Sequence, residues 1–232
     1  MAELTISPIG TELLDDPAAD PATVTESLRN IARANRWFGG AAAVRFGLSR
    51  TLRRVPRGQS ISLLDVGTGL GDLPSVAIRW GAGRGIHIVP TGLELNPVAA
   101  RLASARGVPT AVACAGTPPI ADKGVDVVLV SQLAHHLSPD SIVRLLRTCD
   151  RLARLAVVVA DLRRHALAAT SFRCGGRLLG FDHVTLADGV TSIRRGFSRR
   201  DLLELMARAG VRGEVSHRRG FRLVATWLPS GS

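Results

Sequence analysis

Residues Gln59–Pro74 read QSISLLDVGTGLGDLP, and this stretch decides the fold. The mostly apolar residues Ile61–Leu64 predict a strand that runs into Asp65 and then into a glycine-rich turn. Pro74 and the apolar residues after it predict a helix directly beyond the turn. A strand, a tight turn and a helix in this order are typical of an α/β sheet, and the glycines leave space for a ligand beside the backbone.

Further apolar segments continue the alternation of strands and helices. We expect two helices, from Pro21 to about Phe38 and over residues 41–54, before the first strand, and later strands over residues 85–94, 109–113, 125–131 and 155–160. Residues 211–217 and 221–227 predict a closing antiparallel hairpin. Pro90 lies inside the second strand and predicts a bulge or an irregular pairing there.

The composition bounds the location and the partners. The net charge is +11, and 29 of the 30 basic residues are arginine, which a GC-rich genome would also produce. Nucleic acid is therefore kept as an alternative partner only, because aromatic residues for base stacking do not alternate with the arginines. Three cysteines without ligand-like spacing predict no metal site and a cytoplasmic protein. No apolar run is long enough to predict a membrane span, and no leader is recognisable.

The turn has the order D-x-G-x-G-x-G, whereas a dinucleotide-binding turn has G-x-G-x-x-G. Directly after an apolar strand, this order resembles motif I of the class I S-adenosylmethionine-dependent methyltransferases. The resemblance covers residues 61–227. It implies an α/β fold, a Rossmann-like, seven-stranded, doubly wound sheet with a C-terminal antiparallel hairpin and an N-terminal helical cap. It also implies S-adenosylmethionine as cofactor, with its methionine part held at Asp65, Gly67, Thr68, Gly69 and Gly71.

Other residues complete the predicted cofactor site. Glu94 lies 23 positions beyond Gly71 at the end of a strand, where an acid can accept both hydroxyls of a ribose. The segment around Glu94 and Leu95 resembles the second cofactor motif of the family. The family often has an acid after the third strand, but Cys114 lies there, so we expect backbone groups of Cys114 and Ala115 to bind adenine. Ser131, at the end of the fourth strand, is the last residue of the predicted cofactor site.

Residues Gln132–Leu137 bear on the reaction class. They lack the Asn/Asp-Pro-Pro-aromatic motif of enzymes that methylate adenine rings or amide nitrogens, and their His-His-Leu ending resembles the ubiquinone/menaquinone-biosynthesis-like small-molecule methyltransferases. His135 and His136 are therefore candidate bases that take a proton from a phenol or another hydroxyl. The alternative is that they cap the next helix or form the floor of the cofactor site.

The predicted acceptor pocket involves a long connection. Residues 162–197 are too many for a simple crossover and predict a substrate lid, with a turn at Asp188-Gly189. Candidate pocket residues are Trp37, Phe38, Asp161, Arg164, His165, Phe172 and His183. We expect an N-terminal arm and helical cap over residues 1–57 and a class I methyltransferase domain over residues 58–232.

The sequence thus predicts an enzyme that transfers a methyl group from S-adenosylmethionine to a small, aromatic or phenolic metabolite. O-methylation is favoured and C-methylation stays open. The alternatives are an RNA methyltransferase and a non-catalytic cofactor-binding subunit. The residues do not reveal the acceptor, the oligomeric state or which histidine is the base.

Overall fold

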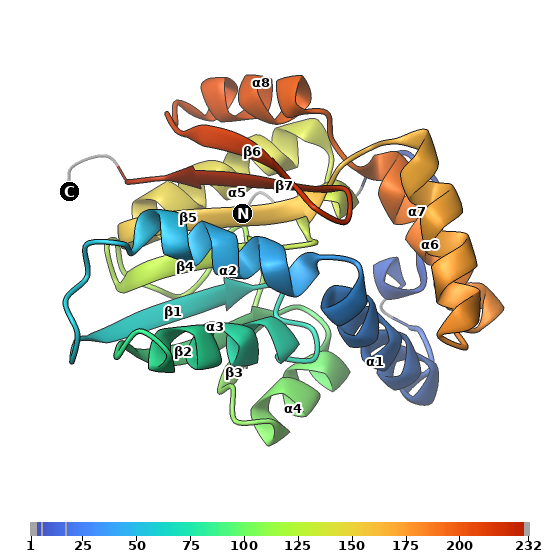
Figure 1. Cartoon of the computed structure of the whole chain (residues 1–232), viewed down its shortest axis with the longest axis horizontal. Coiled ribbons are helices and arrows are strands. Elements are labelled where there is room, and N and C mark those ends of the chain that lie inside the picture. The colour runs from blue at the N-terminus through green and yellow to red at the C-terminus, as the bar shows by residue number, and fades with distance from the viewer. Residues whose placement is uncertain (1–3, 6, 17, 230–232) are drawn as a thin grey trace.

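The computed structural model describes residues 4–5, 7–16 and 18–229 (Figure 1). In chain order its elements are η1 (Leu13–Asp15), α1 (Pro21–Trp37), α2 (Gly40–Thr51), β1 (Ser60–Val66), α3 (Asp72–Ala82), β2 (His87–Glu94), α4 (Pro97–Ala105), β3 (Thr110–Val112), β4 (Val125–Ser131), η2 (Ala134–His136), α5 (Pro139–Leu152), β5 (Ala153–Leu162), α6 (Ala166–Leu178), α7 (His183–Arg195), α8 (Arg199–Ala209), β6 (Glu214–Arg218) and β7 (Arg222–Trp227). None of the helices within these ranges is long and apolar enough to cross a membrane.

The strands form a seven-stranded sheet in the order β3-β2-β1-β4-β5-β7-β6. Strands β1 to β5 pair in parallel, and β7 lies antiparallel between β5 and β6. This order confirms the predicted doubly wound sheet with its C-terminal hairpin. Strand order reverses between β1 and β4, and ligands of open α/β sheets bind outside the carboxyl ends of the strands at such a point.

Helices cover both faces of the sheet, as Figure 1 shows for α2 and α3 on the nearer face and α5 behind. On the nearer face, Val44 and Leu48 of α2 pack with Val158 and Val224 in one buried cluster. A second cluster joins α5 and α8 to the other face. The sequence assigned α2 to the cap, but its buried stripe covers β5 and β7, so α2 belongs to the layer of helices on the sheet.

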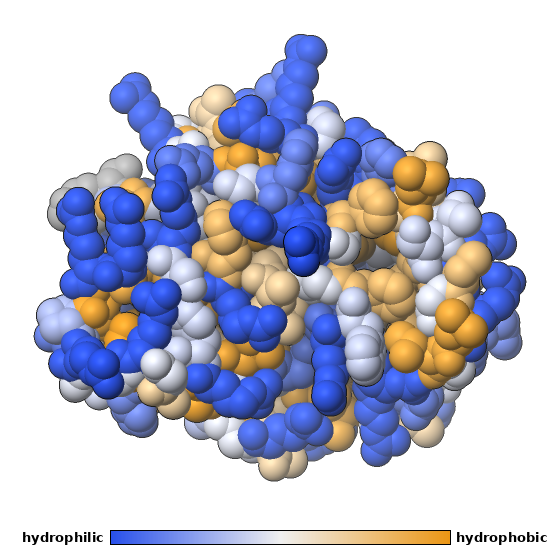
Figure 2. All heavy atoms as spheres, in the orientation of Figure 1, coloured by the Kyte–Doolittle hydropathy of each residue, from blue (hydrophilic) through white to orange (hydrophobic). Residues whose placement is uncertain are grey.

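Helices α1, α6 and α7 lie together beside the carboxyl ends of the parallel strands (right in Figure 1). The predicted lid, residues 162–197, contains the hairpin of α6 and α7. The predicted turn at Asp188-Gly189 was wrong, because both residues lie inside α7. Gly189 serves close packing instead, since a Cβ there would lie 2.1 Å from Cε1 of Phe172. Figure 2 shows apolar side chains gathered over this hairpin, where Leu167 and Leu178 of α6 are exposed.

The predicted irregularity at Pro90 is also wrong. The register between β1 and β2 is continuous through Pro90, which pairs with Leu63. The amide of Gly92 donates to Pro109 on the β3 side, and residues two apart in a strand face the same side. The ring nitrogen of Pro90 therefore faces a side where β3 has not yet begun, so no ladder hydrogen bond is lost there.

Candidate active site

The glycine-rich loop joins β1 to α3 at the carboxyl edge of the sheet. Gly67, Gly69 and Gly71 have φ values of 74°, 54° and 74°, which side chains with a Cβ rarely adopt. Gly71 is the residue before the first turn of α3, and a Cβ there would lie 3.2 Å from Val108. The third glycine therefore allows α3 to pack closely beside the chain that follows α4, while the first two shape the loop.

The carboxylate of Asp65 is buried beneath this loop. Thr68 Oγ1 donates to Asp65 Oδ2 at 2.8 Å, whereas Oδ1 has no hydrogen-bond partner among the described residues. Asp65 is 2% exposed, and this burial raises its pKa to about 8. An unpartnered buried carboxylate oxygen next to two glycines fits the ammonium of a cationic ligand, whose charge would offset the burial.

Glu94 lies at the end of β2 and reaches the same loop. Its Oε2 accepts from the amide of Gly69 at 2.9 Å, and its Oε1 accepts from the amides of Leu95 and Asn96 at 2.8 and 3.1 Å. The side chain of Leu95 itself is exposed. The structure thus places Asp65 and Glu94, predicted from separate motifs, on either side of one turn.

The other predicted cofactor residues lie along neighbouring strand ends. Cys114 and Ala115 follow β3 in a half-buried loop, where the carbonyl of Cys114 accepts from the amide of Thr117 at 3.2 Å. Ser131 ends β4, and its hydroxyl donates to the carbonyl of Ala160 at 3.3 Å. Ser131 therefore ties β4 to β5, and its side chain is already bonded within the sheet.

His135 and Asp161 form a buried pair just beyond the end of β4. His135 lies in η2, and its Nδ1 is 2.6 Å from Oδ1 of Asp161, which lies in β5. His135 is 3% exposed and Asp161 is fully buried, so the carboxylate predicted to touch the acceptor contacts the histidine instead. Burial alone would raise the pKa of Asp161, but the charge and hydrogen bond of His135 outweigh it and lower the pKa.

An ionised Asp161 is a hydrogen-bond acceptor only, so Nδ1 of His135 carries the proton of this bond. In the neutral form of the imidazole, Nε2 is then the nitrogen with the free lone pair, and this atom is buried without a hydrogen-bond partner among the described residues. His135 also lines a groove of about 380 Å³ that runs from residues 7–9 of the N-terminal arm to Phe197 and α8. A buried, unpartnered imidazole nitrogen held by a carboxylate is a candidate proton acceptor.

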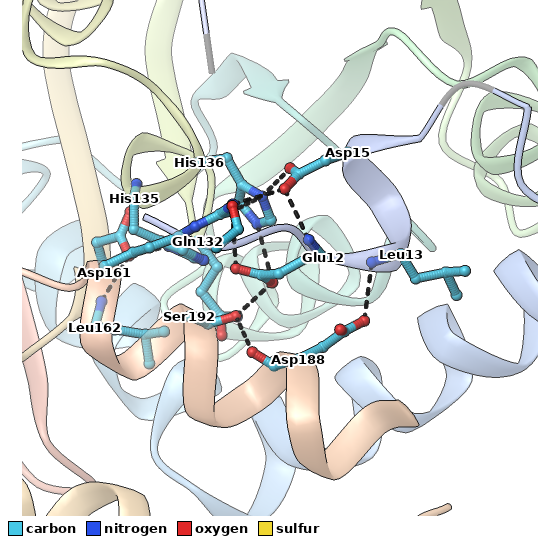
Figure 3. A network of polar contacts seen from close by, with 12 residues as sticks. Glu12, Leu13, Asp15, Gln132, His135, His136, Asp161, Leu162, Asp188 and Ser192 are labelled. Atoms are coloured by element: carbon cyan, nitrogen blue, oxygen red, sulfur yellow. Dashed lines mark hydrogen bonds and ion pairs between the residues drawn. The ribbon is translucent and has the colours of Figure 1, made fainter. Parts of the chain in front are cut away.

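His136 faces the N-terminal arm rather than Asp161 (Figure 3). Its Nδ1 lies 2.8 Å from Oδ1 of Asp15, a residue of η1. Arg195, whose side chain is fully buried at the end of α7, donates to Glu12 Oε1 at 3.0 Å and to Asp15 Oδ2 at 2.8 Å. Ser192 donates to Glu12 Oε2 at 2.6 Å. These contacts fasten the arm across η2 and α7.

Sequence reasoning missed Glu12, Asp15 and Arg195. Each lies in a stretch that was read as a loop, an arm or a paired arginine, and their partners are more than 50 positions away. Burial would raise the pKa of Asp15, but hydrogen bonds from His136 and Arg195 lower it well below its usual range. No local pattern in the sequence signals this network.

A second missed network joins α1 to the end of β4. Gln132 has φ of 54°, an uncommon value for a residue with a side chain. The side-chain amide of Gln132 makes two hydrogen bonds. Its Oε1 accepts from Arg222 Nη1 at 2.7 Å, and its Nε2 donates to Oδ1 of Asn35. Asn35 in turn donates to Asp72 Oδ2 at 3.0 Å. The strained residue is thus held from two sides next to the strand end that carries the histidines.

The predicted pocket residues divide into two groups. Phe38 and Phe172 meet with their ring centroids 5.3 Å apart, which joins the end of α1 to α6. Trp37 is 64% exposed, with the guanidinium of Arg36 over its ring. The structure therefore brings one aromatic residue of the N-terminal region to the lid and leaves the other at the surface.

Two of the three remaining polar candidates, Arg164 and His165, make structural contacts. Arg164 donates to the carbonyl of Gly196 at 3.0 Å and to Asp201 at 2.6 Å, and it lines the same groove as His135. His165 caps α6 through its Nδ1, and its ring stacks on Phe221 at 5.1 Å. His183 is exposed at the first turn of α7.

A family model described as a methyltransferase domain matches residues 64–172, from β1 into α6. The chain therefore contains a methyltransferase domain, and its fold is that of solved S-adenosylmethionine-dependent methyltransferases. The match spans the motif I loop, Glu94 and both histidines. No protein of curated function matches the methyltransferase by sequence similarity.

Solved structures of methyltransferases resemble the whole fold. A SAM-dependent methyltransferase from Aquifex aeolicus is 15% identical with a TM-score of 0.55, and the match covers 90% of this chain and 98% of that one. The O-methyltransferase NcsB1 of neocarzinostatin biosynthesis, solved with S-adenosylmethionine and 2-hydroxy-5-methyl naphthoic acid, is 19% identical with a TM-score of 0.66, over 96% of this chain and 62% of that one. The mitomycin 7-O-methyltransferase MmcR is 20% identical with a TM-score of 0.61, over 94% and 60%. At these identities the likeness shows the fold.

Proposed function

We propose that this methyltransferase transfers the methyl group of S-adenosylmethionine to an oxygen of a small aromatic or phenolic molecule. The observation that carries the proposal is the buried pair of His135 and Asp161, with Nε2 of the histidine unpartnered. Leu133, two residues before His135, lies beside Gly67 of the cofactor loop. A proton acceptor and a cofactor loop at one edge of the sheet are what O-methylation requires.

The chemistry needs little more than alignment and a base. The bound cofactor would supply an electrophilic methyl group on its sulfonium sulfur, and the bond between this sulfur and the methyl carbon would break as the acceptor oxygen takes the methyl group, which leaves the demethylated cofactor as a neutral thioether. A phenol has a pKa near 10, so a neutral imidazole at its hydroxyl assists the loss of the proton as the new C–O bond forms. Asp161 holds the imidazole in the tautomer with Nε2 free and stabilises the imidazolium that results. The rest of the rate enhancement comes from holding the two reactants in contact and excluding water.

In this proposal Asp65 and the loop of Gly67, Thr68, Gly69 and Gly71 hold the methionine part of the cofactor, and Glu94 holds the ribose. Backbone groups at Cys114 and Ala115 bind adenine. The arm, α1 and the α6–α7 hairpin cover the acceptor, with Phe38 and Phe172 as its apolar wall. Two structural neighbours named as O-methyltransferases, one of them solved with a hydroxynaphthoic acid, support an aromatic hydroxyl as the acceptor.

The proposal is tested by product analysis. The full chain is incubated with S-adenosylmethionine and a panel of phenols, and mass spectrometry and NMR show whether a methyl group is added and to which atom. His135→Gln and Asp161→Asn should lower turnover about 10²–10⁴-fold while calorimetric binding of the cofactor stays as in wild type. His217→Gln, at an exposed histidine of β6, is the matched control and should be unaffected.

Two results would overturn the proposal. Methylation of a ring carbon alone would contradict transfer to oxygen. Full activity of the His135→Gln variant would show that His135 is not the base. The RNA alternative would instead be supported by methylation of RNA with an affinity that falls steeply as salt rises.

A further inference from the structure

We propose that Glu12, His135 and His136 form a binding site for a divalent transition-metal ion of the Zn²⁺ type beneath the N-terminal arm. Each of these residues offers one ligand atom, and the three atoms lie within 4.8 Å of one another. Glu12 and His135 are buried, and His136 is mostly buried. Modest side-chain movement would bring three such atoms to the distances of about 2.0–2.2 Å at which zinc binds nitrogen and oxygen.

Both imidazoles are already oriented as metal ligands are. Nδ1 of His135 faces the carboxylate of Asp161 at 2.6 Å, and Nδ1 of His136 faces the carboxylate of Asp15 at 2.8 Å. Metal-binding histidines almost always donate their second ring N–H to such a carboxylate or to a carbonyl, which leaves the other nitrogen free for the ion. His135 Nε2 is buried and unpartnered among the described residues, and His136 Nε2 lies 3.8 Å from Glu12 Oε2.

The charges around the three ligand atoms also suit a cation. Glu12, Asp15 and Asp161 are three buried carboxyl groups at the two histidines, and Arg195 is the buried cation that faces the first two. Arg222 is a second buried cation, and it interacts with Asp161. The three carboxylates therefore exceed the two guanidinium groups by one negative charge, which a divalent ion would compensate. Ser192 donates to the Glu12 carboxylate (Figure 3), and Arg195 donates to its other oxygen, so both residues fix its orientation toward the histidines.

The donor set indicates which metal would bind. Two imidazoles and one carboxylate are typical ligands of catalytic zinc, which keeps a further position for water or substrate, and of related transition metals. Magnesium and calcium prefer sites made of oxygen atoms alone. The site joins η2 to a residue of the arm that lies more than 120 positions away, so ligand spacing in the sequence could not reveal it.

Metal binding would change the role of His135. This consequence rests on the proposed function, whereas the binding site does not. The lone pair of Nε2 cannot bind an ion and accept a proton at the same time, so the metal-bound protein would lack its base. Zn²⁺ should therefore inhibit methyl transfer reversibly, and the ion would hold the arm closed against η2.

The experiment measures binding of Zn²⁺ alone to the metal-stripped full chain by calorimetry, with the visible absorption of Co²⁺ as a second probe. Wild type should bind one ion. Glu12→Gln and His136→Gln should each lower the Zn²⁺ affinity at least about tenfold. Glu26→Gln and His217→Gln, at exposed positions, should bind as wild type does. Circular dichroism and cofactor binding show whether each variant is folded. If His136→Gln does not fold, Glu12→Gln alone still tests the site.

The site is wrong if wild type binds no Zn²⁺, or if both ligand variants bind it as tightly as wild type does. Zinc binding that both variants weaken would support the site even when no phenol is methylated, in which case the proposed function alone fails. Where methylation is found, inhibition by Zn²⁺ that a chelator reverses, and that needs more zinc in Glu12→Gln, would support competition at Nε2.

Discussion

Asp65→Asn should make the cofactor-free protein progressively more stable than wild type as the pH rises. Burial raises the pKa of Asp65 from 3.8 to about 8, so the folded state keeps a proton that the unfolded state releases above about pH 4. Between these pKa values, wild type loses about 1.4 kcal/mol of unfolding free energy per pH unit relative to a side chain that does not titrate. From pH 5 to pH 7 the stability difference should therefore shift by about 3 kcal/mol toward the variant.

The measurement is urea unfolding of both proteins without cofactor at pH 5, 6 and 7. Asp126→Asn is the control, because hydrogen bonds from Ser62 and Arg154 outweigh burial and lower the pKa of Asp126. Its carboxylate is ionised in both states across this range, so its difference from wild type should stay constant. A constant difference for Asp65→Asn as well would refute the reasoning. Asp65→Asn should also bind the cofactor more weakly than wild type, by about 1.5–3 kcal/mol, which is the range for hydrogen bonds to charged groups.

Three further changes test other parts of the structure. Glu94→Ala should weaken cofactor binding by about 1.5–3 kcal/mol in calorimetry, and unchanged binding would place the ribose elsewhere. Arg195→Met should lower the unfolding free energy by about 3–5 kcal/mol and speed proteolysis of the arm, because buried carboxylates lose their cation; an arm that resists protease as in wild type would contradict this. Gly47→Ala should lower the free energy of unfolding by about 1–3 kcal/mol in calorimetry, since the new Cβ would lie 2.3 Å from Val158. Gly83→Ala, with no atom closer than 3.6 Å to the new Cβ, should raise this free energy by about 0.4–1 kcal/mol. Equal effects of the two substitutions would show that the core adapts to the added methyl group.

The sheet and the cofactor loop were predictable because their signals are local. The strand over residues 125–131 was predicted with the bounds that the structure has, since a buried parallel strand is an unbroken apolar run. Asp65 and Glu94 each follow such a run. Parallel strands bring their carboxyl ends to one edge, so two separate motifs could be placed together without knowledge of the structure.

The network around the arm was not predictable, because its contacts join residues that are far apart in the sequence. Glu12 and Asp15 lie in a stretch without periodicity, and their partners His136 and Arg195 are distant in the chain. The pairing depends on how α7 packs over η2, which no residue pattern encodes. Arg195 in particular was one of many paired arginines, and nothing in the sequence distinguishes the buried one from those in solvent.

The position of Pro90 has a consequence for solubility. Strand β3 pairs only with Gly92–Glu94, so the first half of β2 is an open edge of the sheet in the described part of the chain. Open edges can recruit a strand from another molecule, and Val89 beside Pro90 is partly exposed there. Pro90 presents no N–H on that side and interrupts the ladder that an incoming strand would need. The residue that made this strand look doubtful therefore protects the folded protein from edge-to-edge aggregation.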